Sequence, residues 1–278
     1  MESAFRYVIC LSQREWIIEM IYFKYVRMIM KSFMQYRMSL LLTTIGQFLV
    51  SFFAFIGMYL LFERFDNIAG WSFAEVALCF GVAHTAFSIT ECYARGFDVF
   101  QGFIRTGSFD RIMLRPRSTI LQVLGSNFEL SRIGRLVQSL VVLGLAISLL
   151  GITWSIVSML TLVFMILSGV LIFTGIFILG ATVCFFTIEG LEVVNIFTDG
   201  GRELASYPLT IYPRWIMRIF TFIIPFGAFN YLPLQYLTGR ASDFEIIYML
   251  SPLMGAVFLV PCLFVWKFGV RRYLSTGN

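Results

Sequence analysis

The sequence is poor in charged residues and lacks the motifs that catalysis or nucleotide binding would need. Charged residues make up 13% of the 278 residues and hydrophobic residues 59%, whereas soluble domains average about 25% charged and about 45–50% apolar residues. The single histidine, His84, excludes an H-E-x-x-H zinc site, and no Ser/His/Asp set can be argued from it. No G-x-x-x-x-G-K-[ST] sequence is present, which excludes a P-loop for nucleotide phosphates. We therefore expect a chain that is not an enzyme by itself and has no catalytic residues, metal or cofactor of its own.

Cysteine usage indicates no disulfide framework and no metal motif. The five cysteines are odd in number and scattered, and most lie in apolar runs, which is typical of small packing residues. The first 38 residues carry basic residues throughout and no short apolar core before a cleavage site, so we do not expect a signal peptide.

Long apolar runs are the main feature that the sequence does have, and they are typical of membrane-spanning helices. We expect an all-α integral membrane protein with six transmembrane helices in a single transmembrane domain, residues 1–278. Spans one and two fall within 39–94, spans three to five within 133–207, and span six within 245–278, which ends in a cytoplasmic tail. The remaining segments are a cytoplasmic amphipathic helix (1–38), a cytoplasmic loop (95–132) and an outer region that enters the membrane and returns (208–244).

Basic residues favour one orientation of these spans. Lys and Arg are frequent before the first span, in the 95–132 loop and after the last span, while the predicted outer side holds only Arg64, Arg214, Arg218 and Arg240. Because Lys and Arg near a span resist translocation, we expect both termini in the cytoplasm and a multi-pass location in the plasma (inner) membrane. The net charge of +5 then reflects contact with anionic lipids and the cytoplasm, not nucleic-acid binding.

The loop 95–132 carries the densest positive charge and a short predicted helix. Gly107 and Ser108 break and cap the chain, residues 109–114 can form a helix, and Arg115-Pro116 ends it. A solvated basic loop that only fixes topology is one interpretation, and a docking surface for another protein is the other. The mixed face that suits docking combines apolar and charged residues: Phe109, Asp110, Arg111, Ile112 and Met113.

The sequence RTGSFDRIMLRPRS in this loop resembles the cytoplasmic loop of type-two ATP-binding-cassette (ABC) permeases, in the branch of ABC-2 family transporter proteins. The resemblance implies a coupling helix that sits in a groove of a separate ATPase subunit. The positions that match the family pattern are Gly107, Asp110, Leu114, Arg115 and Pro116, and the coupling element implied by the resemblance also includes Phe109 and Arg111.

A second stretch, between residues 207 and 233, supports the same resemblance. Its prolines predict a helix of about twelve residues from Pro213 to Pro225, too short to span a bilayer. A flat interfacial helix is one interpretation. The pattern Tyr207-Pro208, Tyr212-Pro213-x-Trp215 and Ile224-Pro225 resembles the outer re-entrant helices of type-two permeases. That likeness implies an outer gate formed by Pro213, Trp215 and Pro225.

The resemblance also implies function and partners. It favours the permease subunit of an ABC exporter, with ATP and Mg²⁺ bound by a separate nucleotide-binding subunit. The other expected partners are a second permease chain, identical or similar, and membrane lipids, and an amphipathic or lipid-like cargo suits the Phe- and Met-rich spans. The alternatives are a stand-alone secondary transporter or channel and a membrane enzyme acting on lipids. In the amphipathic helix Gln13 to Arg37, the basic side holds Lys24, Arg27 and Lys31, which fits either a connecting helix that helps hold the ATPase or a plain membrane anchor.

Ionisable residues within apolar runs are the remaining candidates. His84 lies near the middle of the second span, beside a stripe of small residues that includes Gly81 and Thr85, and it suits an interhelical hydrogen bond or a proton carrier. On a helix, Asp199, Arg202 and Glu203 share one side, which cannot face lipid. They therefore either line a translocation path or pair with one another.

Overall fold

The computed structural model describes residues 27–28, 31–152, 154–187, 191–241 and 245–275, and these residues are mostly helical. Residues 27–28 and 31–35 are helical in the segment where an amphipathic helix is predicted. Five helices are long: α2 (Arg37–Arg64), α3 (Phe73–Asp98), α7 (Ile133–Leu149), α8 (Ile156–Val183) and α13 (Met254–Arg272).

Within the described ranges, five segments are long and apolar enough to cross a membrane. They are α2, α3 continued by α4 (Phe100–Arg105), η1 (Leu130–Arg132) with α7, α8, and α12 (Glu245–Leu250) with η4 (Ser251–Leu253) and α13. These five match the first, second, third, fourth and sixth predicted spans. The prediction of an all-helical, multi-pass membrane protein is therefore confirmed.

The predicted fifth span is not among those five. Its segment forms α9 (Leu191–Ala205), a helix of 15 residues, which is about 22 Å long against a hydrocarbon core of about 30 Å. Among the described residues, a sixth candidate crossing is found only if α10 (Arg214–Phe222) and the following η3 (Gly227–Tyr231) and α11 (Leu232–Leu237) count as one span, and these two parts meet at 88°. This bent pair begins after Pro213, as the proline pattern predicts, and is either a broken span or a re-entrant element.

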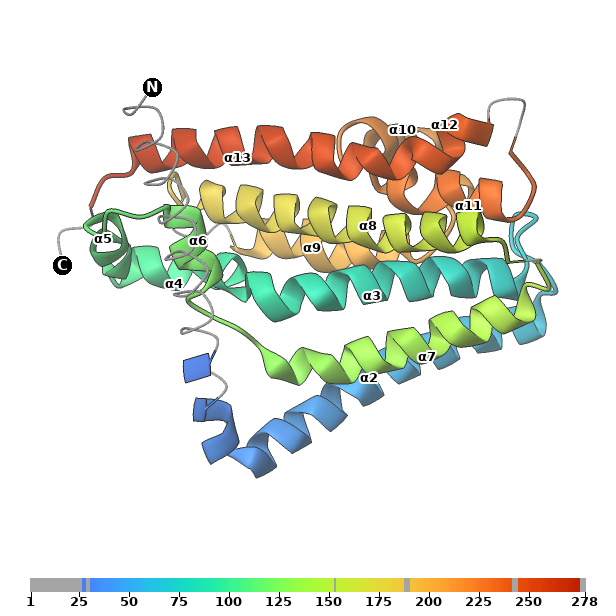
Figure 1. Cartoon of the computed structure of the whole chain (residues 1–278), viewed down its shortest axis with the longest axis horizontal. Helices are drawn as coiled ribbons and strands as arrows, with labels where there is room; N and C mark the ends of the chain where they lie inside the picture. The colour runs from blue at the N-terminus through green and yellow to red at the C-terminus, as the bar shows by residue number, and fades with distance from the viewer. Residues whose placement is uncertain (1–26, 29–30, 153, 188–190, 242–244, 276–278) are drawn as a thin grey trace, which may run out of the picture.

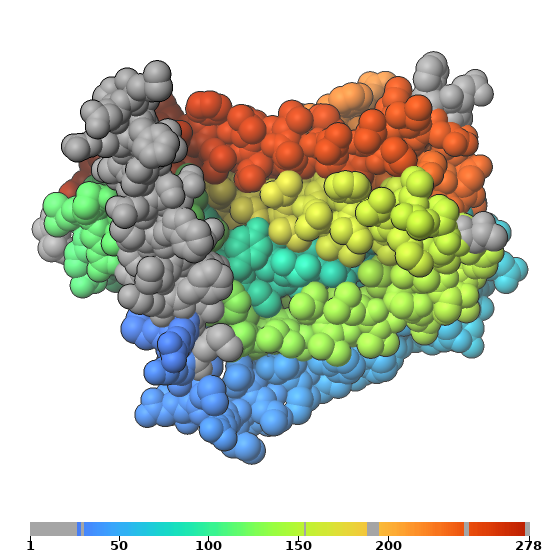
Figure 2. Space-filling view, in the orientation of Figure 1, coloured from blue at the N-terminus to red at the C-terminus, as the bar shows by residue number. Residues whose placement is uncertain are grey.

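The long helices run along the same axis of the molecule, with α3 in the middle (Figure 1). Helix α3 packs between α7 and α8, α2 packs on the outer side of α7, and α13 packs on the outer side of α8. In the space-filling view α3 is visible only as a narrow strip between its neighbours (Figure 2). Helices α2 and α13 leave most of their apolar surface exposed, as expected for surfaces that meet lipid or another subunit.

The small-residue stripe of α3 lies against α7. A Cβ on Gly81 would lie 3.0 Å from the Cα of Leu143, and the hydroxyl of Thr85 donates to Ser139 Oγ at 3.0 Å. Close approach of the two helices therefore depends on small side chains at this contact.

The short helices gather at the two ends of the bundle (Figure 1). At one end lie α4, α5 (Ser108–Met113) and α6 (Thr119–Leu124), together with the start of α2 and the end of α13. At the opposite end lie α10, α11 and α12. All the predicted cytoplasmic segments with described residues thus share one end of the molecule, and we call it the α5 end.

Candidate functional site

Helix α5 is held at the α5 end by one buried aromatic residue. Its N-terminal boundary, Gly107, has φ +64°, the left-handed conformation that favours glycine. Phe109 is 0% exposed, and its ring packs edge-on against Phe100 of α4 and Tyr273 beyond α13, with ring centres 5.1 Å apart in both cases. This packing fixes the face that α5 turns outward.

The outward face of α5 and of the turn after it is mixed apolar and basic. Leu114 is 84% exposed and Met113 is also exposed, and Arg111 and Arg115 are exposed beside them. The prediction that Phe109 and Ile112 belong to this face is wrong, because both are buried beneath it.

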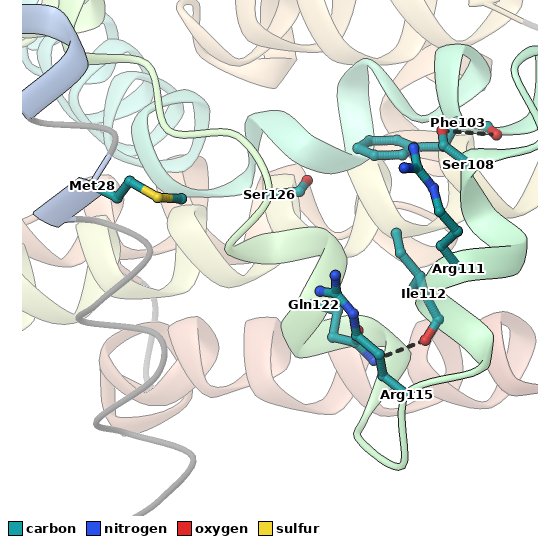
Figure 3. Close-up of a pocket in the computed structure, with 8 residues that line it drawn as sticks. All are labelled: Met28, Phe103, Ser108, Arg111, Ile112, Arg115, Gln122 and Ser126. Carbon is teal, nitrogen blue, oxygen red and sulfur yellow. Dashed lines mark hydrogen bonds between the residues drawn. The ribbon is translucent and has the colours of Figure 1, made fainter.

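A cavity of about 300 Å³ opens between this loop and Met28. Figure 3 shows Arg111 and Ile112 of α5 and Arg115 on one side, Gln122 of α6 below Ser126, and Met28 facing them from the other side. The Gln122 amide donates to the carbonyl of Ile112 at 3.1 Å and so ties α6 to α5. The two arginines of the outward face, Arg111 and Arg115, therefore line this cavity together with the buried Ile112.

A highly charged buried cluster surrounds Glu91 on α3. Arg135 of α7 lies 2.6 Å from Glu91 Oε2, and Arg132 and Arg95 lie 3.5 and 3.7 Å from Glu91 Oε1. Arg135 also donates to Gln47 of α2 at 2.9 Å. One carboxylate therefore gathers three guanidinium groups, and the cluster links α2, α3 and α7.

Arg95 extends this cluster toward the α5 end. It pairs with Asp98 and, at 3.1 Å, with Glu129 in the segment that precedes η1. The contact of Glu91 with Arg95, one turn apart on α3, is thus part of a larger network. Beside it lies a cavity of about 480 Å³ that Asn195 and Asp199 of α9 also line.

The predicted internal pairing on α9 is also observed. Arg202 lies 3.0 Å from Asp199 and 2.6 Å from Glu203, and its guanidinium sits 5.0 Å from the ring centre of Phe87. The Arg202 side chain is 13% exposed, whereas those of Asp199 and Glu203 are 58% and 51% exposed. The face of α9 that remains open in a single chain therefore carries two carboxylates, with the apolar side chain of Ile196, 67% exposed, on the same side of the helix.

His84 belongs to a polar contact between α2, α3 and α7. Ser51 of α2 donates to the side chain of Gln138 at 2.6 Å, and its oxygen lies 3.4 Å from His84 Nδ1. The His84 ring stacks on Phe80, with centres 3.8 Å apart. The geometry thus brings His84 into an interhelical network, separate from the Asp199, Arg202 and Glu203 group.

A family model for ABC-2 family transporter proteins matches residues 48–277. The chain belongs to the ABC-2 family. No curated protein and no solved structure gives a significant match. The protein is therefore a membrane permease of an ABC transporter, and family membership implies association with an ATP-binding subunit.

The predicted site residues of this ABC-2 permease divide between the two ends. The predicted coupling residues all lie at the α5 end: Gly107, Phe109, Asp110, Arg111, Leu114, Arg115 and Pro116. At the same end Arg27 and Lys31 of the predicted connecting helix are exposed, and Lys24 lies outside the described residues. The predicted gate residues lie at the opposite end: Pro213 directly before α10, Trp215 within α10 and exposed, and Pro225 after α10 and buried. The structure therefore does not bring the two predicted sites together.

Sequence reasoning missed an ionic contact at the end of the permease opposite α5. Arg240, just beyond α11, lies 2.9 Å from Glu75 in the first turn of α3 and donates to the carbonyl of Gly70 at 3.0 Å. Its guanidinium also lies 4.5 Å from the ring centre of Trp71. The available signal was Glu75 itself, an acidic residue at the start of an apolar run, but its partner is distant in the sequence.

Proposed function

We propose that this ABC-2 permease works as an exporter driven by a separate ATP-binding subunit that seats on the outward face of α5. The observation that carries the proposal is the combination of the exposed Leu114 with Arg111 and Arg115 beside it. The packing of Phe109 holds this surface against the bundle. Arginine is enriched both at protein interfaces and among binding hot spots. The sequence has no P-loop, so ATP and Mg²⁺ belong to the partner subunit in this proposal.

We infer that the open face of α9 faces a second permease chain across a translocation path. A charged side chain costs roughly 2.5–3.5 kcal/mol at mid-bilayer by insertion scales. Asp199 and Glu203 are both about half exposed in one chain, which supports a watery path or a second subunit on this side. The α5 end faces the cytoplasm in this arrangement, in agreement with the basic residues of the loop.

The surroundings of α9 support an amphipathic cargo. One side of the helix borders the charged cavity of about 480 Å³ that Asp199 lines. Phe197, two residues earlier, lines an apolar groove of about 330 Å³ together with Leu179 and Ile224. A molecule with a polar head and an acyl chain matches both kinds of surface in a way that a small ion does not.

Two measurements test this function. A Walker-motif ATPase should copurify with the permease, and Leu114→Asp or Arg115→Glu should weaken its binding at least tenfold, while Phe65→Asp, an exposed site at the opposite end, should leave binding unchanged. Vesicles that contain the pair should move a fluorescent long-chain amphiphile only with ATP. Uphill transport by the permease chain alone would favour the secondary-transporter alternative and contradict the proposal.

A further inference from the structure

Four aromatic residues surround Phe109, and we call them the aromatic socket. Besides Phe100 and Tyr273, the ring centre of Phe185 lies 5.3 Å from that of Phe109 and that of Trp266 lies 6.4 Å away. The socket residues come from α4, the turn after α8, the last part of α13 and the chain beyond α13. Helix α5 therefore packs, through Phe109, against the ends of three candidate spans.

The chain beyond α13 turns back onto α5. Helix α13 ends at Arg272, and Tyr273 is extended, with φ −62° and ψ 130°. Successive side chains of an extended segment point in opposite directions: Leu274 is 85% exposed, while Tyr273 meets Phe109 and Ser275 Oγ lies 2.6 Å from Asp110 Oδ2. Burial, followed by the neighbouring carboxylate of Asp110, raises the pKa of Tyr273.

Helix α5 needs support of this kind. It has six residues, far fewer than the roughly 12–15 that make an isolated helix even marginally stable in water. Trp266 supports the same region from α13, because its indole N–H donates to Thr119 Oγ1 of α6 at 3.1 Å. Closely packed interiors have low compressibility and transmit displacement.

We propose that residues 273–275, the C-terminal strap, fix the coupling helix to α13, and that Tyr273 and Ser275 are positioning residues for energy coupling. The inference rests on the proposed function, in which the ATP-binding subunit pushes on α5. With the strap in place, movement of α5 passes through Phe109 to Trp266 and to α13. Without the strap, α5 tilts about the turns that connect it to α4 and α6. Its movement is then not transmitted to α13.

The strap itself is tested on the permease alone. Tyr273→Ala and Ser275→Ala should raise amide hydrogen exchange across α5 at least fivefold, and Ser275→Thr should retain protection because it keeps the hydroxyl. Leu274→Ala is the matched control, since that side chain points away from α5, and it should leave exchange unchanged. Equal exchange in all four variants would overturn the strap.

The coupling role is tested on the complex with the copurifying ATPase. A fluorescent label on Phe222→Cys, an exposed residue of α10 at the end opposite α5, reports movement when ATP is added. Tyr273→Ala and Ser275→Ala should bind the ATPase within about twofold of wild type, yet lose at least four fifths of the ATP-induced emission change. A full emission change in these variants would overturn the inference and leave the proposed function standing. No response to ATP in the wild-type complex would overturn both.

Discussion

Arg135 Nη1 lies 2.6 Å from Glu91 Oε2, and this buried ion pair joins α7 to α3. Both side chains are less than 10% exposed, and the same carboxylate also faces Arg95 and Arg132. Removing one partner of a buried pair leaves an uncompensated charge, at a typical cost of about 3–5 kcal/mol. We expect Glu91→Leu to lower the free energy of unfolding in mixed micelles by about this amount.

Two controls accompany that measurement. Asp199→Asn alters a carboxylate that is 58% exposed, so the change should stay within about 1 kcal/mol. The double variant Glu91→Leu, Arg135→Leu should lose less stability than Glu91→Leu alone, because it also removes one stranded charge. Equal losses for Glu91→Leu and Asp199→Asn would contradict the buried-pair account.

A close backbone contact makes a second prediction. A Cβ on Gly134 of α7 would lie 2.0 Å from the carbonyl oxygen of Thr44 on α2, and backbone cannot give way as a side chain can. We expect Gly134→Ala to cost about 1–3 kcal/mol of unfolding free energy or more. Gly144→Ala, on the same helix with nothing within 4 Å, should be neutral or slightly stabilising. A neutral Gly134→Ala would mean that α2 and α7 are not this close.

Apolar runs predicted the five long spans because burial in lipid depends on composition averaged over many residues. The same average fails for α9, where Asp199, Arg202 and Glu203 share one face and the helix has 15 residues. The composition of a short amphipathic helix does not indicate whether the helix crosses the membrane. The number of spans therefore could not be predicted from the sequence alone.

The sequence predicted where in the chain the candidate site lies, but not which side chains form its exposed surface. The sequence located α5 through Gly107 and Pro116, yet it placed Phe109 outside, because the outward side of a six-residue helix depends on what packs beneath it. Here the partners are Trp266 and Tyr273, more than a hundred residues away in the chain. Contacts at such separations cannot be inferred from one sequence with local patterns.

A third prediction concerns alkaline pH and Tyr212, which lies outside the candidate spans. Burial, followed by the charges of Tyr207 and Glu203, raises the pKa of Tyr212 to about 12. A phenol whose pKa is higher in the folded state contributes stability below its unfolded pKa of about 10, and this contribution is lost as the pH rises toward about 12. Tyr212→Phe cannot ionise, so its unfolding free energy should fall less steeply than that of wild type above about pH 10.

The measurement is unfolding at several pH values between about 9 and about 11.5. Tyr36→Phe removes an exposed phenol and serves as the control, with the same slope expected as for wild type. Parallel slopes for wild type and Tyr212→Phe would show that this phenol is not buried in the folded protein.

The contact of Arg240 with Glu75 makes the last prediction. Glu75 is 7% exposed and Arg240 is 42% exposed, so removing the guanidinium leaves a buried carboxylate that water reaches only in part. We expect Arg240→Gln to lower the unfolding free energy by about 1–2 kcal/mol, less than for a fully buried pair because of this screening. Arg240→Lys should recover only part of the loss, since lysine keeps the charge but lacks the planar fork that also stacks on Trp71. Arg214→Gln, at an exposed arginine of α10, should change stability by no more than about 0.5 kcal/mol. If Arg240→Lys behaved like wild type, the planar contact with Trp71 would contribute nothing and the charge alone would hold this end of α3.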